Sequence, residues 1–349
     1  MITYQNTRTD LTAPRLFRVS AERPLAMLRQ CPVYKPTPMS AVPSLAQTLG
    51  TGELYVKDES QRMNLGSFKA LGGAYALAQM VCDKADNEDT MSERFKSVAR
   101  EMTFITASAG NHGLSLAAGA KVFGSNAVIV LSTTVPEPFA ERIRGIGADV
   151  VRVDGNYEDS VAHAIELADE NDWLLLADGS WEGYIERPAL VMEGYSVIAE
   201  EARIEFSASG DWPTHVFLQA GVGGLAASFA ANIREHWDVQ PTIIIVEPDA
   251  APCLLQSVKS GKLTRGEGPE SNMGRLDCKD ASLITFEALR CDADLFVTVS
   301  DEQAQAATDL LGEHGFPSTP SGAATFAALT EMTLPKDSRC FMIVSEGPE

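Results

Sequence analysis

Short apolar runs rich in β-branched residues alternate with longer amphipathic stretches, and this alternation constrains the fold more than any other feature of the sequence. Fully apolar short strands that alternate with helices are typical of parallel sheets covered by helices on both faces. We predict strands at residues 54–57, 103–106, 127–131, 149–153, 173–177, 215–219, 242–246, 295–299 and 340–345, and helices at 139–147, 161–171, 188–204 and 301–314.

The pattern predicts an α/β fold with open, mostly parallel sheets and helices on both faces. The 349 residues leave room for two domains, because one domain usually takes about 150 residues. We expect a large domain from residues 1–102 and 179–349, with a smaller, mobile domain from residues 103–178 inserted in it. Ligands of such sheets bind beyond the carboxyl ends of the strands, so the residues that follow each strand are candidates for a site.

Composition limits the classes of partner. The net charge is −20, and such a surface repels polyphosphate backbones, so we expect no nucleic acid to bind. No run approaches the roughly 20 apolar residues that span a bilayer, and the N-terminus lacks the apolar segment of a secretory signal. We therefore expect a cytoplasmic protein without a membrane segment. Cysteines and histidines are scattered without CxxC or HxxxH pairs, which disfavours disulfides and a metal site.

The first candidate segment, NLGSFKALGGA at residues 64–74, follows the predicted strand at 54–57. Ser67 is a reasonable N-cap, which places Lys69 in the first helical turn. The positive end of the helix dipole and desolvation should together lower the pKa of this lysine and expose a nucleophilic amine. The alternative is a surface lysine beside a pair of glycines that serve helix packing.

The second candidate segment, TASAGNHG at residues 106–113, follows the predicted strand at 103–106. Its small residues expose several backbone amides at the start of a helix, which favours an anion site. Asn111 can donate and accept hydrogen bonds, and Ser108 adds a hydroxyl. The alternative is a tight turn capped by these two side chains, and His112 alone is more often a satisfied polar residue than a base.

The third candidate segment, AGVGGLA at residues 220–226, directly follows the predicted strand at 215–219. A glycine-rich turn that leads into a helix holds phosphate through its backbone amides. Gly221, Gly223 and Ala226 also fit the GxGxxA dinucleotide fingerprint, and Glu247 ends the next strand. On this segment alone, a nicotinamide-dependent oxidoreductase is an equal alternative.

The combination of the three segments separates these alternatives. A dehydrogenase needs neither the SFK segment nor the SAGNHG segment. A cofactor with one aldehyde and one phosphate needs an amine and a phosphate site, and an amino-acid substrate needs a carboxylate site beside them. The three segments supply these three requirements.

With these segments in place, the chain resembles the fold-type II pyridoxal-phosphate enzymes, the group of tryptophan synthase β and threonine dehydratase. Within this group it is most similar to the diaminopropionate ammonia-lyase family. The matching stretches span nearly the whole chain in the family's order. They are YKPTP at 34–38, VKDES at 56–60, LGSFKALGGAY at 65–75, WEGY at 181–184, VFLQAGVG at 216–223, VEP at 246–248 and SEG at 345–347.

The resemblance implies that pyridoxal 5'-phosphate is the cofactor and that the large domain binds it. Lys69 would carry it as an imine, Phe68 would pack beside the pyridine ring, and Ser345 would face the pyridine nitrogen. Asn111 would contact the phenolic oxygen. The segment that would hold the phosphate consists of Gly221, Val222, Gly223, Gly224 and Leu225. The substrate carboxylate would be received by Ser108, Ala109, Gly110, Asn111 and His112.

The resemblance also implies a reaction. The released Lys69 would take the α-proton of a small amino acid, the β-substituent would leave, and hydrolysis would give a 2-keto acid such as pyruvate and ammonia. Asp178 fits an acidic position of the lyase pattern and is the second catalytic candidate. The family commonly forms homodimers, which we carry over as an expectation.

Two departures from the lyase pattern keep alternatives open. The pattern usually has aspartate where this sequence has Ala109, and the loop SAGNHG is nearer to that of serine and threonine dehydratases. A C-terminal extension that the resemblance implies does not follow Glu349. Elimination from 2,3-diaminopropionate, dehydration of a 3-hydroxy amino acid and the nicotinamide-dependent oxidoreductase therefore all remain as hypotheses.

Overall fold

The computed structural model describes residues 1–8, 15–108, 110–155 and 157–348. Its strands form two sheets. The seven-stranded sheet has the order β1-β10-β9-β8-β11-β3-β2, and the four-stranded sheet has the order β6-β5-β4-β7. The larger sheet contains β1 (Thr3–Gln5), β2 (Met39–Ala41), β3 (Glu53–Asp58), β8 (His215–Gln219), β9 (Thr242–Pro248), β10 (Leu295–Val299) and β11 (Arg339–Val344). The smaller sheet contains β4 (Thr103–Ala107), β5 (Asn126–Ser132), β6 (Asp149–Val153) and β7 (Leu174–Leu175).

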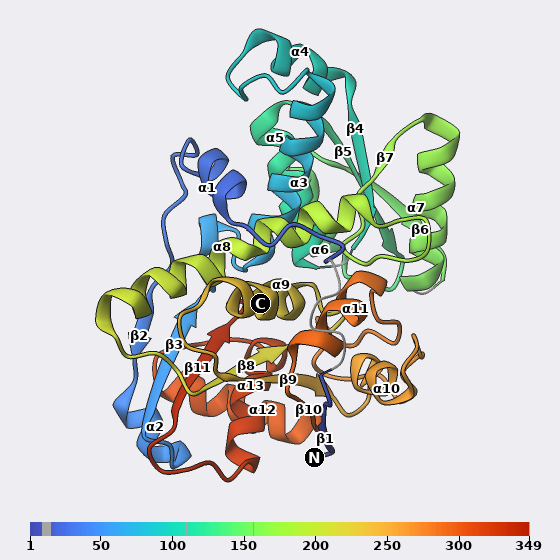
Figure 1. The fold of residues 1–349 in the computed structure, drawn as a ribbon. Coiled ribbons are helices and arrows are strands. Elements are labelled where there is room, and N and C mark those ends of the chain that lie inside the picture. Colours follow the sequence, from blue (N-terminus) through green and yellow to red (C-terminus); the bar gives the residue numbers. More distant parts are fainter. Residues whose placement is uncertain (9–14, 109, 156, 349) are drawn as a thin grey trace.

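Helices connect the strands and cover the sheets (Figure 1). In the first part of the chain they are α1 (Glu22–Leu28), α2 (Pro43–Leu49), the 3-10 helix η1 (Arg62–Asn64), α3 (Lys69–Lys84), α4 (Glu93–Glu101), α5 (Asn111–Phe123), α6 (Glu137–Ile146) and α7 (Tyr157–Asn171). The later ones are α8 (Glu186–Ser209), α9 (Gly224–His236), α10 (Cys253–Ser260), α11 (Leu283–Asp292), α12 (Asp301–Glu313) and α13 (Pro320–Glu331).

The predicted α/β class with mostly parallel sheets is confirmed. Within the two sheets of the described residues, antiparallel pairing is confined to two edges, where β1 pairs with β10 and β2 with β3. All other strand pairs are parallel. The two antiparallel edge strands were not predicted, because three residues are too few to show a periodic pattern.

The large sheet separates two layers of the core. Successive residues of β9 point to opposite faces, as in any strand. Ile243 and Ile245 pack in the cluster that contains α3, α8 and α9, whereas Ile244 and Val246 pack in the cluster with α13. The first cluster also includes Ile129 of the small sheet, so one continuous core joins the two sheets.

The small sheet and its helices occupy the upper part of Figure 1, above the layer formed by α8 and α9. Helices α3 and α4 lie with this upper part although they precede residue 103 in the chain, and α3 packs against α5. The predicted division at residues 103 and 178, and the mobility of the smaller unit, stay predictions. No helix in the described part of the chain is long and apolar enough to cross a membrane.

Candidate active site

Lys69 is the first residue of α3 and meets a carboxylate from a distant segment. Its Nζ donates a hydrogen bond to Oδ2 of Asp178, 109 residues further along the chain. Asp178 comes shortly after β7 of the small sheet. About a fifth of each side chain is exposed, 21% for Lys69 and 20% for Asp178, so a small molecule can reach the pair. The structure thus brings together the two predicted catalytic residues.

Two expectations for the start of α3 are wrong. Phe68, not Ser67, is the N-cap, and its phenyl ring cannot accept a cap hydrogen bond. Ser67 instead pairs with Glu346 in an isolated backbone bridge. The pKa of Lys69 is raised rather than lowered. Burial lowers it, but the neighbouring Asp178 carboxylate raises it by more. In the same way burial raises the pKa of Asp178, and the Lys69 ammonium outweighs this and lowers it.

Tyr195 of α8 connects the lysine to the glycine-rich turn. Lys69 Nζ lies 5.8 Å from the centroid of the Tyr195 ring, and a Cβ built on Gly224 would lie 3.4 Å from its Cε2 atom. Phe68 contacts the same ring edge-on at a centroid distance of 4.9 Å. Burial raises the pKa of Tyr195 to about 12, so the phenol stays neutral. Sequence reasoning missed Tyr195, since it stands within a helix and belongs to no motif that was singled out.

The glycine-rich turn lies between the end of β8 and the start of α9, as predicted. Gly223 is the N-cap residue and has a φ of 97°, a conformation that favours glycine. Leu225 and Gly224 stand in the first turn, where backbone N–H groups have no partner within a helix. A Cβ on Gly179, next to Asp178, would lie 3.9 Å from Cγ1 of Val222, so this turn borders the Lys69–Asp178 pair. The arrangement suits an anion beside an amine.

A segment after α10 covers the outer side of this turn. A Cβ on Gly221 would lie 3.0 Å from Sγ of Cys278 and 3.1 Å from the backbone oxygen of Arg275. Burial raises the pKa of Cys278 to about 12, which keeps its thiol protonated. Neither residue was singled out from the sequence, because the stretch around them has no periodic pattern and no recognisable motif.

The SAGNHG loop joins β4 to α5, which begins at Asn111 with Gly110 as its N-cap. The backbone N–H of Gly110 donates to Oγ of Ser108 at 3.3 Å. His112 is buried, its Nε2 lies 2.7 Å from the backbone oxygen of Leu176, and burial lowers its pKa. Ala109 lies outside the described residues. The loop therefore presents a helix start and a hydroxyl, while His112 is engaged in the core.

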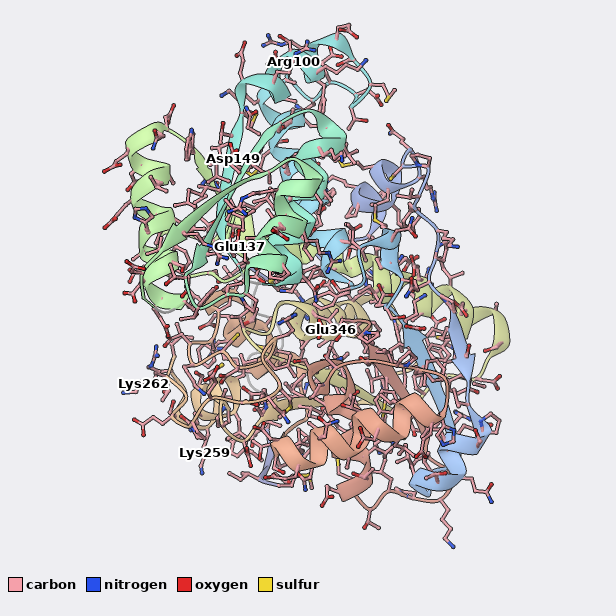
Figure 2. All side chains as sticks on the ribbon, turned by 180° about the vertical axis from the view of Figure 1, so that it is seen from behind. Arg100, Glu137, Asp149, Lys259, Lys262 and Glu346 are labelled. Carbon is pink, nitrogen blue, oxygen red and sulfur yellow. The ribbon has the colours of Figure 1, made fainter. Side chains whose placement is uncertain are left out.

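The side chain of Asn111 forms a hydrogen bond with a residue near the C-terminus rather than with its sequence neighbours. Its Nδ2 donates to Oε2 of Glu346, and Oε1 of the same carboxylate accepts from Oγ1 of Thr319. Figure 2 places Glu346 at the centre of the molecule, between the small-sheet region above and the large-sheet region below. Ser345, the residue before it, accepts a hydrogen bond from the backbone N–H of Phe68 at 3.1 Å through its backbone oxygen. The sequence pointed to the SEG stretch at 345–347, but the contact of Glu346 with Asn111 was not predicted.

Comparison with known proteins identifies the family. The family model described as "Pyridoxal-phosphate dependent enzyme" matches residues 31–346. This chain belongs to that family. It is 37% identical over 284 residues to the diaminopropionate ammonia-lyase of Escherichia coli (strain K12). The alignment covers 80% of this chain and 71% of that enzyme. The chain is 28% identical over 298 residues to the biosynthetic L-threonine dehydratase of Pasteurella multocida (strain Pm70). That alignment covers 85% of this chain and 52% of the dehydratase.

A solved structure extends the likeness to the whole chain. Holo diaminopropionate ammonia-lyase from Escherichia coli aligns with a TM-score of 0.89 at 31% identity and covers 99% of this chain and 93% of that chain. The expected fold type and cofactor are confirmed. The family membership decides between the two ligands considered for the GxGxxA stretch, and pyridoxal phosphate replaces the dinucleotide.

The residues present suit pyridoxal phosphate. The aldehyde requires an amine, which Lys69 offers beside Asp178, and the phosphate requires free backbone amides, which the start of α9 offers. The hydroxyl of Tyr195 is buried between these two features without a hydrogen-bond partner among the described residues. A polar group of this kind is rare in a protein interior, and a bound polar ligand would account for it.

Proposed function

We propose that this pyridoxal-phosphate enzyme catalyses β-elimination from 2,3-diaminopropionate and releases pyruvate and ammonia. The observation that carries the proposal is the Lys69–Asp178 pair, which sets an amine and a carboxylate beside the glycine-rich turn. The similarity to diaminopropionate ammonia-lyase over 71% of that enzyme's length supports the choice of substrate.

We assign the cofactor contacts to three elements. The turn from Gly221 through Leu225 would hold the phosphate, because its amides lie at the positive end of α9. Lys69 would hold the aldehyde carbon, and Phe68 and Tyr195 would flank the site, since their rings lie 5.4 and 5.8 Å from Lys69 Nζ. Asn111 and Ser345 remain the candidates for the phenolic oxygen and the pyridine nitrogen. When bound, the cofactor supplies the acceptor for the electron pair that remains at the α-carbon after proton loss.

Proton transfer falls to Lys69 and Asp178. In its neutral form the Lys69 amine accepts the proton from the α-carbon of the substrate. The resulting ammonium lies within reach of Asp178, which stabilises the positive charge as it does in the present structure. A β-amine must leave in protonated form, and we assign the Lys69 ammonium as its proton donor. Asp178 itself acts as an anion, because its pKa is lowered.

We assign the substrate carboxylate to the start of α5. Gly110 and Asn111 present backbone amides there, and Ser108 adds a hydroxyl. This loop comes from the small sheet, whereas the glycine-rich turn comes from the large one. A substrate bound between them would hold the two sheets together, so we propose that residues 103–178 close over it and exclude water.

Dehydration of a 3-hydroxy amino acid is the second candidate. The SAGNHG loop favours it, because Ala109 stands where the lyase pattern has an aspartate. The similarity to an L-threonine dehydratase points in the same direction, at lower identity and over a smaller share of that enzyme. The two reactions differ only in the leaving group, an amine or a hydroxyl.

Kinetics with matched substrates distinguish the two. We expect kcat/KM for 2,3-diaminopropionate to exceed the values for serine and threonine by at least about tenfold, which corresponds to about 1.4 kcal/mol of transition-state binding. The reverse order would assign the dehydratase activity instead. Lys69→Ala serves as the control for keto acid released without the enzyme's amine.

We also propose a cytoplasmic homodimer. Support for the dimer is the habit of the family that the sequence resembles, and support for the location is the metabolic activity for which the bacterial relatives are named. Sedimentation of the holoenzyme at micromolar concentration tests the dimer, and a monomer at these concentrations would refute it.

A further inference from the structure

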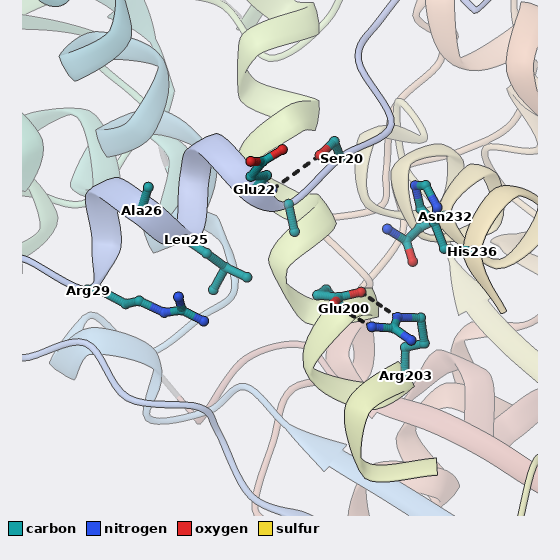
Figure 3. Close-up of a pocket in the computed structure, with 10 residues that line it drawn as sticks. Ser20, Glu22, Leu25, Ala26, Arg29, Glu200, Arg203, Asn232 and His236 are labelled. Atoms are coloured by element: carbon teal, nitrogen blue, oxygen red, sulfur yellow. Dashed lines mark hydrogen bonds and ion pairs between the residues drawn. The ribbon is translucent and has the colours of Figure 1, made fainter. Parts of the chain in front are cut away.

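A cavity lies between α1, α8 and α9, and neither Lys69 nor Asp178 lines it (Figure 3). It has a volume of about 560 Å³, within the range of about 300–1,000 Å³ that small-molecule sites occupy. Helix α1 forms one wall, and α8 and α9 form the other. Its lining includes Glu22, Arg29, Glu200, Arg203, Asn232 and His236.

Asn232 of α9 is the most unusual group in this cavity. Its side chain is 1% exposed, and neither its amide nitrogen nor its amide oxygen has a hydrogen-bond partner among the described residues. Leaving a buried polar group unpaired costs about 1–3 kcal/mol, and few native groups remain so. Figure 3 shows the amide directed from α9 toward α8, into the space that the cavity residues surround. Both atoms are covered by neighbouring side chains, so a ligand with a donor and an acceptor would satisfy them together by displacing that cover.

The walls of the cavity are held in place. Arg203 and Glu200, both on α8, form a two-bonded ion pair with N–O distances of 2.6 and 2.8 Å. Nε2 of His236 lies 2.7 Å from the backbone oxygen of Val19, which ties the end of α9 to the segment that precedes α1. The shape of the cavity is therefore not set by the conformation of a single mobile side chain.

The opposite wall presents one charge of each sign. Glu22 and Arg29 lie at the two ends of α1, and both are exposed. Within the described residues neither side chain takes part in an ion pair. Each is free to turn toward a ligand in the cavity, Arg29 toward an anionic group and Glu22 toward a cationic one.

We propose that this cavity is a second binding site, one for a free α-amino acid that acts as an effector. A zwitterionic amino acid carries a carboxylate acceptor and an ammonium donor on the same carbon atom. The Asn232 amide can donate to the first and accept from the second, while Arg29 and Glu22 supply the matching charges. A simple anion or a simple cation would satisfy only one half of this arrangement.

The two helices behind the cavity lead to the candidate active site. Helix α8 carries Tyr195, which lies beside Lys69, and Glu200 is on the same helix. Helix α9 begins at Gly224 in the glycine-rich turn and carries Asn232 further along. A ligand that bridges α1 to both helices changes the packing of the elements that position the amine and the phosphate site. Binding at one site then alters binding at the other, and the coupling is reciprocal.

The binding test uses holoenzyme reduced with borohydride, so that the Lys69 amine is blocked and the active site cannot take an amino acid covalently. Titration calorimetry is run with glycine, alanine, valine, leucine and aspartate, which lack a β-leaving group. We expect saturable binding of at least one of them. Asn232→Leu, which keeps the volume but removes both polar atoms, should weaken it at least about tenfold. No binding by the reduced wild type would overturn the proposal.

Two substitutions at exposed positions test the site with little risk that the variant fails to fold. Arg29→Ala and Glu22→Gln lie on the surface of α1 and should each weaken binding by about threefold to tenfold, whereas Arg142→Ala on the surface of α6 should leave it unchanged. Equal binding by the wild type and all pocket variants would place the ligand elsewhere. The unreduced enzyme should show a change of at least about twofold in kcat/KM when the bound amino acid is added, and an unchanged value would overturn the effector role.

Discussion

Lys69 and Asp178 are far apart in the sequence, yet the amine of one donates a hydrogen bond to the carboxylate of the other. The lysine opens a helix that begins beside the large sheet, and the aspartate follows a strand of the small sheet. The pair therefore links the two parts of the molecule. It also sets the protonation of both groups, because each lies in the field of the opposite charge.

Replacement of the lysine tests the attachment of the cofactor. We expect Lys69→Ala to lower kcat by about a thousandfold or more, because no other amine takes its place. The fold should persist with a modestly lower melting temperature, because Asp178 loses its counter-ion while about a fifth of its side chain is exposed. After borohydride reduction and digestion of the wild type, the pyridoxyl label should be found on the peptide that contains Lys69. A label on another lysine would refute the assignment.

Gly223→Asp should impair cofactor retention. The φ of 97° disfavours any residue with a Cβ, and that Cβ would lie 2.9 Å from both Leu254 and Thr285, so the turn must shift away from its present shape. The added carboxylate would also repel the phosphate. Cofactor absorbance after gel filtration should fall at least about tenfold. The matched control is Gly124→Asp, at a φ of 79° with open space around it, which should retain the cofactor.

Ala109 leads us to expect a preference for one enantiomer. Removal of the α-proton from both enantiomers needs a base on each face, and Lys69 serves one face only. The methyl group of Ala109 cannot accept a proton, and His112 is engaged with a backbone oxygen in the core. We expect L-2,3-diaminopropionate to react and the D enantiomer to be nearly inert, and Ala109→Asp should raise the D rate more than the L rate. Similar rates of keto-acid release from both by the wild type would reveal a second base.

Several parts of the fold could be read directly from the sequence. The strands at 149–153, 215–219 and 295–299 were predicted with the bounds that the structure has, because each contains a short run of apolar, partly β-branched residues. The glycine-rich turn was placed correctly for the same reason, since the end of β8 marks its start. A segment was predicted correctly where its structure depends on residues within the same segment.

The errors arose where a distant residue decides. The raised pKa of Lys69 depends on Asp178, and the bridge of Ser67 depends on Glu346. Neither partner is visible from the segment that contains the lysine. Burial was treated correctly as an effect that lowers the pKa of Lys69, but the nearby carboxylate outweighs it. Glu346 was overlooked because its contact with Asn111 joins residues 235 positions apart.

A buried ionic network joins α8 to β3 and η1, and we expect it to contribute to stability in acid. Glu201 accepts from Arg62 at 2.9 and 2.8 Å and lies 2.8 Å from Lys57 Nζ. Burial raises its pKa, but Arg62 and Lys57 outweigh burial and lower it. Glu201→Gln leaves the buried Lys57 ammonium with Glu205 at 3.8 Å as its remaining ion-pair partner, while Arg62 keeps Glu59, and should lower the free energy of unfolding by about 3 kcal/mol at pH 7.

The sign of the pH dependence follows from the lowered pKa. The stabilisation by Glu201 is fully present above the pKa of an unfolded glutamate and is lost as the pH falls through the lower folded value. Urea unfolding of both proteins between pH 7 and pH 3 should therefore show a difference that shrinks as the solution becomes acidic. A difference that stays constant or grows would contradict the role given to this carboxylate.

The most direct test of the proposed reaction is the ratio of products from 2,3-diaminopropionate and the holoenzyme. Elimination of the β-amine followed by hydrolysis yields two molecules of ammonia for each molecule of pyruvate, because both nitrogen atoms leave the carbon skeleton. We predict this ratio, with no product formed by Lys69→Ala. Serine as substrate should give equal amounts of the two products at a lower rate. Failure to release pyruvate from 2,3-diaminopropionate, while serine or threonine is converted efficiently, would contradict the account.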